Sequence, residues 1–303
     1  MIERKYPEAE ANGLSKLLKQ VFGEDRFPVK VEELVLDYTQ QRFPAAPIKR
    51  VQGKDLPGFE GMLVEKPDKT QWKIIYNSGI RSQGRIRFTL AHEFGHYLLH
   101  RERQSEFSCS QQDMEEWDAE EREIETEADC FAATLLMPLD DFRRQVGAAK
   151  ISFDLLSHLS DRYGVSLTAA ALRWIEIAER RAILIAVRDD HLLWARSSQA
   201  AYKSGAVFVT RKRTYAVPPE SLAHSCNAGF SFQEGSLPAQ TWLPKEPRDM
   251  PLTELTFVNE YYDYTLAFLL MPDAVPKWER EEEDDDDPAS RYDSAMREGR
   301  FKA

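Results

Sequence analysis

The feature that most constrains this sequence is a His-Glu-x-x-His motif at residues 92–96, set within an apolar stretch from Thr89 to His100. Residues four positions apart lie on one face of an α-helix, so His92 and His96 can present their imidazoles to one metal ion. Glu93 lies roughly 100° further around the helix axis, where its carboxylate is beside the metal and suits a general base for a bound water. The apolar flanks predict a buried helix, in which unpaired imidazoles would be costly, and a metal ion supplies the partner.

A catalytic zinc site needs a third protein ligand and an open position for water. The candidate lies on a predicted helix over 120–136, where acidic sequence gives way to apolar sequence. Glu125 can reach the metal, and Asp129, one turn later, can accept the free N–H of a ligand histidine. Glu121 shares this face and is the alternative third ligand, whereas Glu127 points roughly 200° away from Glu125.

Two stretches together carry a family resemblance. Residues 87–96 read Arg-Phe-Thr-Leu-Ala-His-Glu-Phe-Gly-His, and residues 125–138 begin Glu-x-Glu-Ala-Asp and end Leu-Leu-Met-Pro. Their order and spacing resemble the ImmA/IrrE family of bacterial zinc metallopeptidases over the first half of the chain. Many members of that family have Asn where this chain has Asp129, and either residue can accept a hydrogen bond.

The resemblance implies a zincin-like domain in which His92, His96 and Glu125 bind Zn²⁺ and Glu93 is the catalytic base. It also implies a regulatory endopeptidase that cleaves a helix-turn-helix repressor and so switches genes on, as in stress responses or the control of mobile elements and phages. His100 continues the histidine face, but as a fourth protein ligand it would close the site. We therefore predict that His100 is a helix-end or supporting histidine.

Composition limits the other possibilities. The chain of 303 residues has a formal net charge of −11 and a sequence pI near 5.2, which argues against non-specific binding to nucleic acid or to a membrane surface. Cys109, Cys130 and Cys226 are widely spaced without a Cys-x-x-Cys motif, so they form neither a disulfide framework nor a cysteine zinc site. The sequence begins without an apolar leader and contains no apolar run that could cross a bilayer, so we expect a cytoplasmic protein.

Periodicity and turn residues predict an α+β protein. We predict that residues 1–148 form the metallopeptidase domain and that residues 149–181 form a helix-turn-helix-like segment in which Ser166 is an N-cap. Residues 182–275 are predicted to form a small β-rich domain for sensing or docking, and residues 276–303 an acidic disordered tail. Apolar stripes predict a helix over 9–22 and a second helix that opens after Phe27 and Pro28. Strands are predicted over 59–65 and 71–76, and an exposed edge of this hairpin could pair with an extended substrate backbone. Strands over 182–187 and 192–196 are predicted to form a hairpin around Asp189 and Asp190, and further β-like runs lie over 206–210, 214–217 and 254–270. The polar segment 101–123 is predicted to be a loop with a solvated helical part.

Two rival functions fit the same residues. In the first, the chain is a DNA-binding transcriptional regulator with a structural zinc site. The second helix of the helix-turn-helix-like segment begins Leu-Thr-Ala-Ala-Ala, however, without a side chain that can read a base edge. In the second, the chain is a metal-dependent hydrolase of a non-peptide amide, because the motif fixes the water chemistry and not the substrate. The group that stabilises the oxyanion is left open, with Tyr97 and His100 nearby in sequence.

Overall fold

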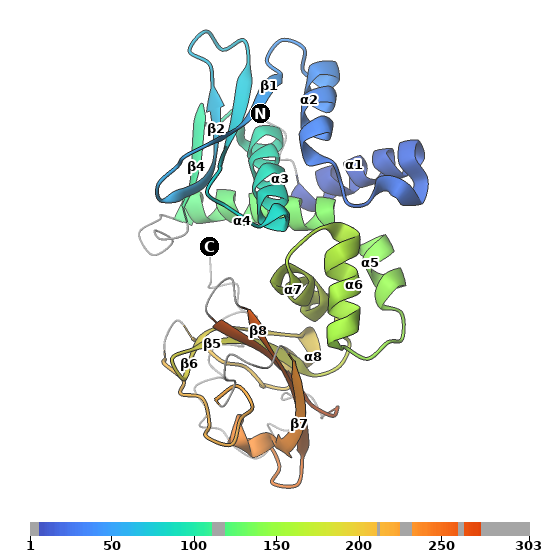
Figure 1. Ribbon diagram of the computed structural model, residues 1–303, viewed down its shortest axis with the longest axis vertical. Coiled ribbons are helices and arrows are strands. Elements are labelled where there is room, and N and C mark those ends of the chain that lie inside the picture. Colours follow the sequence, from blue (N-terminus) through green and yellow to red (C-terminus); the bar gives the residue numbers. More distant parts are fainter. Residues whose placement is uncertain (1–5, 111–118, 211–212, 225–231, 260–263, 274–303) are drawn as a thin grey trace, which may run out of the picture. The chain divides into compact units, whose positions relative to one another are not determined.

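A computed structural model describes residues 6–110, 119–210, 213–224, 232–259 and 264–273 (Figure 1). The chain divides into two compact units, Met1–Ala170 and Ala171–Ala303. This division falls within the segment 149–181, and our predicted domain limits stay predictions. The acidic tail predicted over 276–303 lies outside the described residues. Among the helices of the described ranges, none combines the length with the apolar character that crossing a bilayer requires.

The first unit begins with two helices that their apolar stripes predict. Helix α1 (Pro7–Phe22) buries Ala11, Leu14 and Leu18 and ends at Gly23, which has a φ of +60°. A short 3-10 helix, η1 (Gly23–Arg26), leads towards α2 (Val31–Arg42). The positive φ at the end of α1 suits Gly23, because residues with a side chain rarely adopt such an angle.

A mixed four-stranded sheet follows, in the order β1-β3-β2-β4. Its strands are β1 (Ile48–Lys54), β2 (Phe59–Glu65), β3 (Trp72–Asn77) and β4 (Glu106–Ser110). The pair β1 and β3 is parallel, and β2 is antiparallel to both β3 and β4. The predicted hairpin is therefore confirmed as β2 and β3, but both strands are interior. The expectation that this hairpin offers an exposed edge to substrate is wrong, because β4 forms within the segment predicted as a loop and covers β2.

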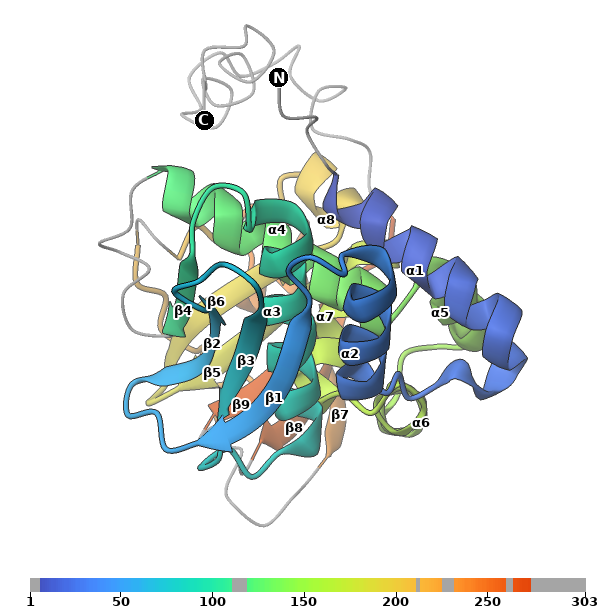
Figure 2. The same ribbon diagram turned by 90° about the horizontal axis from the view of Figure 1, so that it is seen from above.

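The long helix α3 (Gln83–His100) packs against β2, β3 and the second long helix, α4 (Ala119–Leu136) (Figure 2). Ser82 caps the start of α3, since its hydroxyl accepts a hydrogen bond of 3.3 Å from the backbone N–H of Arg85. Helix α4 is followed by α5 (Leu139–Val146). The pairing of α3 with α4 is what positions the site described below.

The predicted helix-turn-helix segment forms as α6 (Phe153–Tyr163) and α7 (Leu167–Ile177). Gly164 ends α6 in the left-handed conformation, and the Ser166 hydroxyl caps α7 by accepting a 3.1 Å hydrogen bond from the backbone N–H three residues on. The guanidinium of Arg87 on α3 donates to the carbonyl of Gly164. A Cβ on Gly84 would lie 2.9 Å from the backbone of this turn, so the turn is packed tightly against the first turns of α3.

The second unit is built on an antiparallel five-stranded sheet in the order β6-β5-β9-β8-β7. The elements are β5 (Ala182–Arg188), β6 (His191–Ser197), α8 (Gln199–Lys203), β7 (Gln233–Pro238), η2 (Ala239–Thr241), β8 (Pro251–Asn259) and β9 (Tyr264–Leu270). The predicted hairpin around Asp189 and Asp190 is confirmed, and both residues have positive φ, of 50° and 55°. Those angles match the primed turn that two-residue hairpin loops favour.

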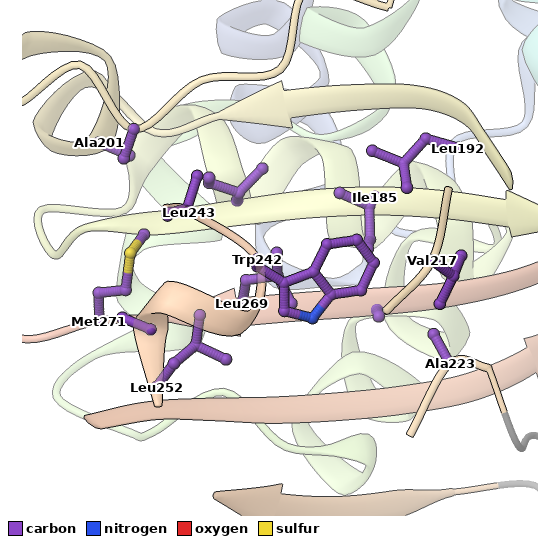
Figure 3. Packing of buried hydrophobic residues seen from close by; sticks show 14 of the residues in the cluster. Ile185, Leu192, Ala201, Val217, Ala223, Trp242, Leu243, Leu252, Leu269 and Met271 are labelled. Carbon is purple, nitrogen blue, oxygen red and sulfur yellow. The ribbon is translucent and has the colours of Figure 1, made fainter. Parts of the chain in front are cut away.

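The inner strands β5 and β9 of this sheet are buried on both faces. On one face, Ile185 and Leu269 pack with Trp242 and Leu252 in a single apolar cluster (Figure 3). On the other face, the ring of Phe268 lies 5.3 Å from that of Trp174 on α7. Burial on two faces explains why β5 and β9 read as nearly continuous apolar runs rather than as alternating sequence.

The predicted α+β class, with a helical region and a β-rich C-terminal part, is confirmed. Two details of the second unit are wrong. The runs 206–210 and 214–217 were expected to be strands, but the structure gives them only an isolated bridge between His191 and Ala216. Strand β7 was not expected, because its sequence contains Gly235 and Pro238, which are typical of turns.

Candidate metal centre

Helix α3 carries three histidines on one face, and all three are buried. His92, His96 and His100 follow one another at intervals of four residues, and their exposed fractions are 6%, 0% and 0%. The sheet lies on one side of this helix and α4 on another, so the apolar residues around the motif pack against these two elements. The polar face is thereby held between two elements that can contribute further side chains.

Close packing brings α4 within reach of the motif. Gly95 faces α4, where a Cβ would lie 3.1 Å from the ring of Phe131 and 3.3 Å from the backbone of Ala128. The absence of a side chain at Gly95 and the methyl of Ala128 let the two helix axes approach closely. Glu125, one turn before Ala128, consequently reaches the histidines of α3.

Three ligand atoms converge between the helices. The Nε2 atoms of His92 and His96 lie 2.9 Å apart, and the two carboxylate oxygens of Glu125 lie 3.1 Å from the first and 3.3 Å from the second. A tetrahedral ion with ligand distances near 2.0–2.1 Å separates its ligand atoms by about 3.3 Å. Within the described residues, this is the group of His, Cys, Asp and Glu side chains whose geometry suits a metal ion. The mixed nitrogen and oxygen donors fit a divalent transition metal such as zinc.

The protonation states also suit a metal. Burial lowers the pKa of His96 to about 4, so its imidazole is neutral at neutral pH and has a lone pair to offer. Burial alone would raise the pKa of Glu125, but the hydrogen bonds of its carboxylate with His92 and His96 bring that pKa well below its usual range. The group therefore presents the neutral imidazole of His96 and the carboxylate of Glu125, which are forms that bind metal.

Asp129 lies where the spacing on α4 predicts it. Its Oδ1 is 2.9 Å from Nδ1 of His92, while Nε2 of the same ring faces the other two ligand atoms. Since Nε2 must be free of a proton to bind metal, Nδ1 carries the proton and donates it to the carboxylate. Such a contact fixes both the tautomer and the orientation of a ligand histidine.

Glu93 is fully buried and is not among the three converging ligands. Its carboxylate lies against β2, where a Cβ on Gly61 would be 2.6 Å from Oε1 of Glu93 and 2.5 Å from the Cγ2 methyl of Thr89. Glu93 is thus held one position along the helix from the ligand His92. Its assignment as general base, like those of the ligands, stays a prediction that this arrangement supports.

The other residues considered from the sequence lie elsewhere. Glu121 is exposed and is not part of the ligand group. Tyr97 is buried, and its hydroxyl donates a hydrogen bond of 2.9 Å to the carbonyl of Ala46. The Tyr97 hydroxyl is thus engaged in the fold, and the oxyanion-stabilising group is not assigned.

Several residues that support the site are not apparent from the sequence. Phe107 of β4 stacks on the imidazole of His96, with ring centroids 4.6 Å apart and planes 18° apart. Gly61 and Gly95 provide space, and Glu127 contacts His100. Only His100 had a signal, namely its four-residue spacing from His96. The others depend on how α3 meets α4, β2 and β4.

Fold and site together define a metallopeptidase-type domain, with a buried His-Glu-x-x-His helix on a small mixed sheet and a candidate third metal ligand from the next helix. Residues 50–174 match the family model of the IrrE N-terminal-like domain, peptidase family M78. Through that segment the chain is similar to this family, as the resemblance over 87–138 predicts. No curated protein matches the chain. The family match ends within α7 and leaves the C-terminal sheet outside it.

Proposed function

We propose that the chain is a zinc-dependent endopeptidase that cleaves a transcriptional repressor at one or very few peptide bonds. The observation that carries the proposal is the convergence of His92, His96 and Glu125, with Glu93 buried on the same helix as the two histidines. Three protein ligands leave a coordination position open, as in catalytic zinc sites, whereas structural sites have four. This supports an enzyme over a DNA-binding regulator with structural zinc.

Each residue has a separate task in this reaction. His92, His96 and Glu125 would hold the ion, and Asp129 orients the ring of His92. Zn²⁺ in such a site lowers the pKa of a bound water and polarises a carbonyl group. Glu93 accepts the proton of the attacking water and then delivers it to the leaving amine.

The choice of substrate rests on the family and on charge. The resemblance implies a helix-turn-helix repressor, and the net charge of −11 favours encounter with a basic DNA-binding protein. A large part of the chain lies beyond the peptidase motifs, which suits docking of one partner or sensing of a signal. The turn between α6 and α7 is packed against α3 through Arg87 and Gly84, which agrees with a packing role for this segment rather than with reading of bases.

The test is co-expression of the full chain with the transcriptional repressor encoded nearest to its gene, followed by mass spectrometry of the repressor. The wild type is expected to cut the repressor once or a few times and to leave unfolded casein essentially intact. Glu93→Gln should abolish the cut while the purified protein keeps about one zinc per chain, because Glu93 is the base and not a ligand.

Two further variants separate the roles on α4. Glu125→Ala should lose both zinc and cleavage, whereas Glu120→Ala, an exposed change on the same helix, should keep both. Loss of zinc in Glu93→Gln together with retention in Glu125→Ala would reverse the assigned roles. Rapid digestion of casein with all candidate repressors intact would count against a regulatory function.

A further inference from the structure

Behind the ligand His96 lies a buried row of three side chains. Nδ1 of His96 is 3.1 Å from Nδ1 of His100, and Nε2 of His100 is 2.9 Å from Oε2 of Glu127. His96 and His100 are fully buried, and the Glu127 side chain is 14% exposed. The row runs from α3 to α4 and ends on a carboxylate, although Glu127 points away from Glu125 around the helix.

The protons in this row have one consistent arrangement. Nε2 of His96 faces the other ligand atoms and is the metal-binding nitrogen, so Nδ1 carries its proton. That proton can be accepted only if Nδ1 of His100 has a lone pair, which places the proton of His100 on Nε2. The Nε2–H of His100 then donates to the Glu127 carboxylate. Each contact contains one hydrogen, and all three groups have their partners.

The ring of His96 is also held on its face. Phe107 stacks on it in nearly parallel planes, while His100 holds its edge through Nδ1. Together these contacts limit both the tilt of the ring and its rotation about the Cβ–Cγ bond. The other ligand histidine is held differently, because Nδ1 of His92 meets the carboxylate of Asp129, whose side chain is 62% exposed.

We propose that His100 and Glu127 are positioning residues that set the tautomer and orientation of His96 through this row. The carboxylate of Glu127 acts on His96 through His100, which makes the metal-binding nitrogen a better electron donor than it would be in an isolated imidazole. The proposal rests on His96 as a metal ligand. It does not require that the substrate be a repressor or even a peptide.

The first measurement reads the ring protons directly. In the ¹⁵N-labelled, zinc-loaded full chain, NMR correlations of the histidine ring nitrogens should report a proton on Nδ1 for His96 and on Nε2 for His100. In Glu127→Ala, His100 should lose this preference, whereas Glu120→Ala should leave it unchanged. A proton on Nδ1 of His100 in the wild type would overturn the proposal, whatever the enzyme cleaves.

The second measurement is zinc affinity, determined by competition with a chromophoric chelator. His100→Leu keeps much of the buried volume but cannot accept a hydrogen bond, and it should weaken zinc binding roughly ten- to hundred-fold. His100→Gln restores an acceptor and should recover part of the loss. Zinc affinities within twofold of the wild type for both His100→Leu and Glu127→Ala would overturn the proposal.

Circular dichroism shows whether the His100 variants fold. If they do not fold, the wild-type tautomers and the zinc affinity of Glu127→Ala decide the question. The visible spectrum of the Co²⁺-loaded protein adds an independent readout. Its bands should shift in Glu127→Ala and stay in place in Glu120→Ala. If the tautomers and affinities are as expected but no peptide is cut, the proposed function fails and the positioning role stands.

Discussion

Gly61 leaves the space that the carboxylate of Glu93 occupies. Position 61 is in the interior strand β2, and a methyl group there would overlap both Glu93 and the Thr89 methyl. The carboxylate is the flexible end of its side chain, whereas a β-branched Thr89 within a helix has little rotamer freedom. A substitution at Gly61 therefore displaces Glu93 first.

We expect Gly61→Ala to lower the rate of cleavage by at least tenfold while zinc content stays near one per chain, because the base moves and the ligands do not. The rate is measured on the substrate found by co-expression. Gly53→Ala is the matched control, since Gly53 is in strand β1 of the same sheet and its added methyl would meet the ring of Tyr76 instead. Full activity of Gly61→Ala would show that Glu93 does not need its present position.

At this scale, sequence predicts what lies within one helix and misses what lies between elements. The i, i+4 rule brings His92 and His96 together, and it places Asp129 one turn after Glu125. The rule cannot show that Glu127 meets His100, because that contact depends on the rotation of α4 against α3. For the same reason the sequence of β2 does not indicate that Gly61 lies against Glu93, since that contact depends on how β2 meets α3.

At the scale of elements, Asp141 joins three of them. Its buried carboxylate on α5 accepts hydrogen bonds from Nε of Arg162 at 2.7 Å and from the hydroxyl of Tyr163 at 2.8 Å, both on α6, and it pairs with Arg144. Arg144 also contacts Glu24 of η1. Burial would raise the pKa of Asp141, but the hydrogen bonds from Arg162, Tyr163 and Arg144 outweigh it and lower that pKa to about 2.

This network predicts a pH-dependent stability. Because folding lowers the pKa of Asp141, its ionised form stabilises the folded chain above about pH 4, and the stabilisation is lost as the pH falls towards 2. Asp141→Asn should cost about 2 kcal/mol of unfolding free energy at pH 7, and the difference from wild type should shrink at low pH. Urea unfolding of metal-free protein at several pH values measures this.

The control is Asp154→Asn, an exposed change on α6 that should alter stability little at any pH. A difference between Asp141→Asn and wild type that stays constant from pH 7 to pH 2 would assign the loss to packing rather than to the charge.

Elements with clear apolar periodicity were predictable, whereas the edge strands β1, β4 and β7 were not. Strand β4 reads Glu-Phe-Ser-Cys-Ser, and β1 reads Ile-Lys-Arg-Val-Gln-Gly-Lys. An edge strand has one neighbour and often one solvated face, so polar residues are common there and hide its alternation. The failure to predict β4 matters for the site, because β4 supplies Phe107, which stacks on His96.

At the scale of the whole molecule, the two units have separate cores. The apolar cluster around Trp242 contains residues of the C-terminal unit alone, and the converging ligands all belong to the first unit (Figure 3). Sequence predicted a β-rich C-terminal part because β5 and β9 are strongly apolar. Strand order could not be predicted, since the pairing of β5 with β9 joins segments about eighty residues apart.

Metal removal should therefore act locally. Bound metal stabilises only those states that contain the site, by about 2.7 kcal/mol at a free concentration of one hundred times Kd. In hydrogen exchange read by mass spectrometry, a chelator should speed exchange in α3 and α4 by up to roughly a hundredfold. Exchange in β5 and β9 should stay the same. Equal acceleration in both units would show that they unfold as one.

The two glycines around the metal centre have a genetic consequence. Gly61 admits Glu93, and Gly95 admits α4, so both positions contribute by lacking a side chain. A missense change in a glycine codon always adds atoms, whichever residue results. The mutational target of this site is therefore larger than its chemically active residues, and inactive alleles should arise at these two codons as well as at the codons of the ligands.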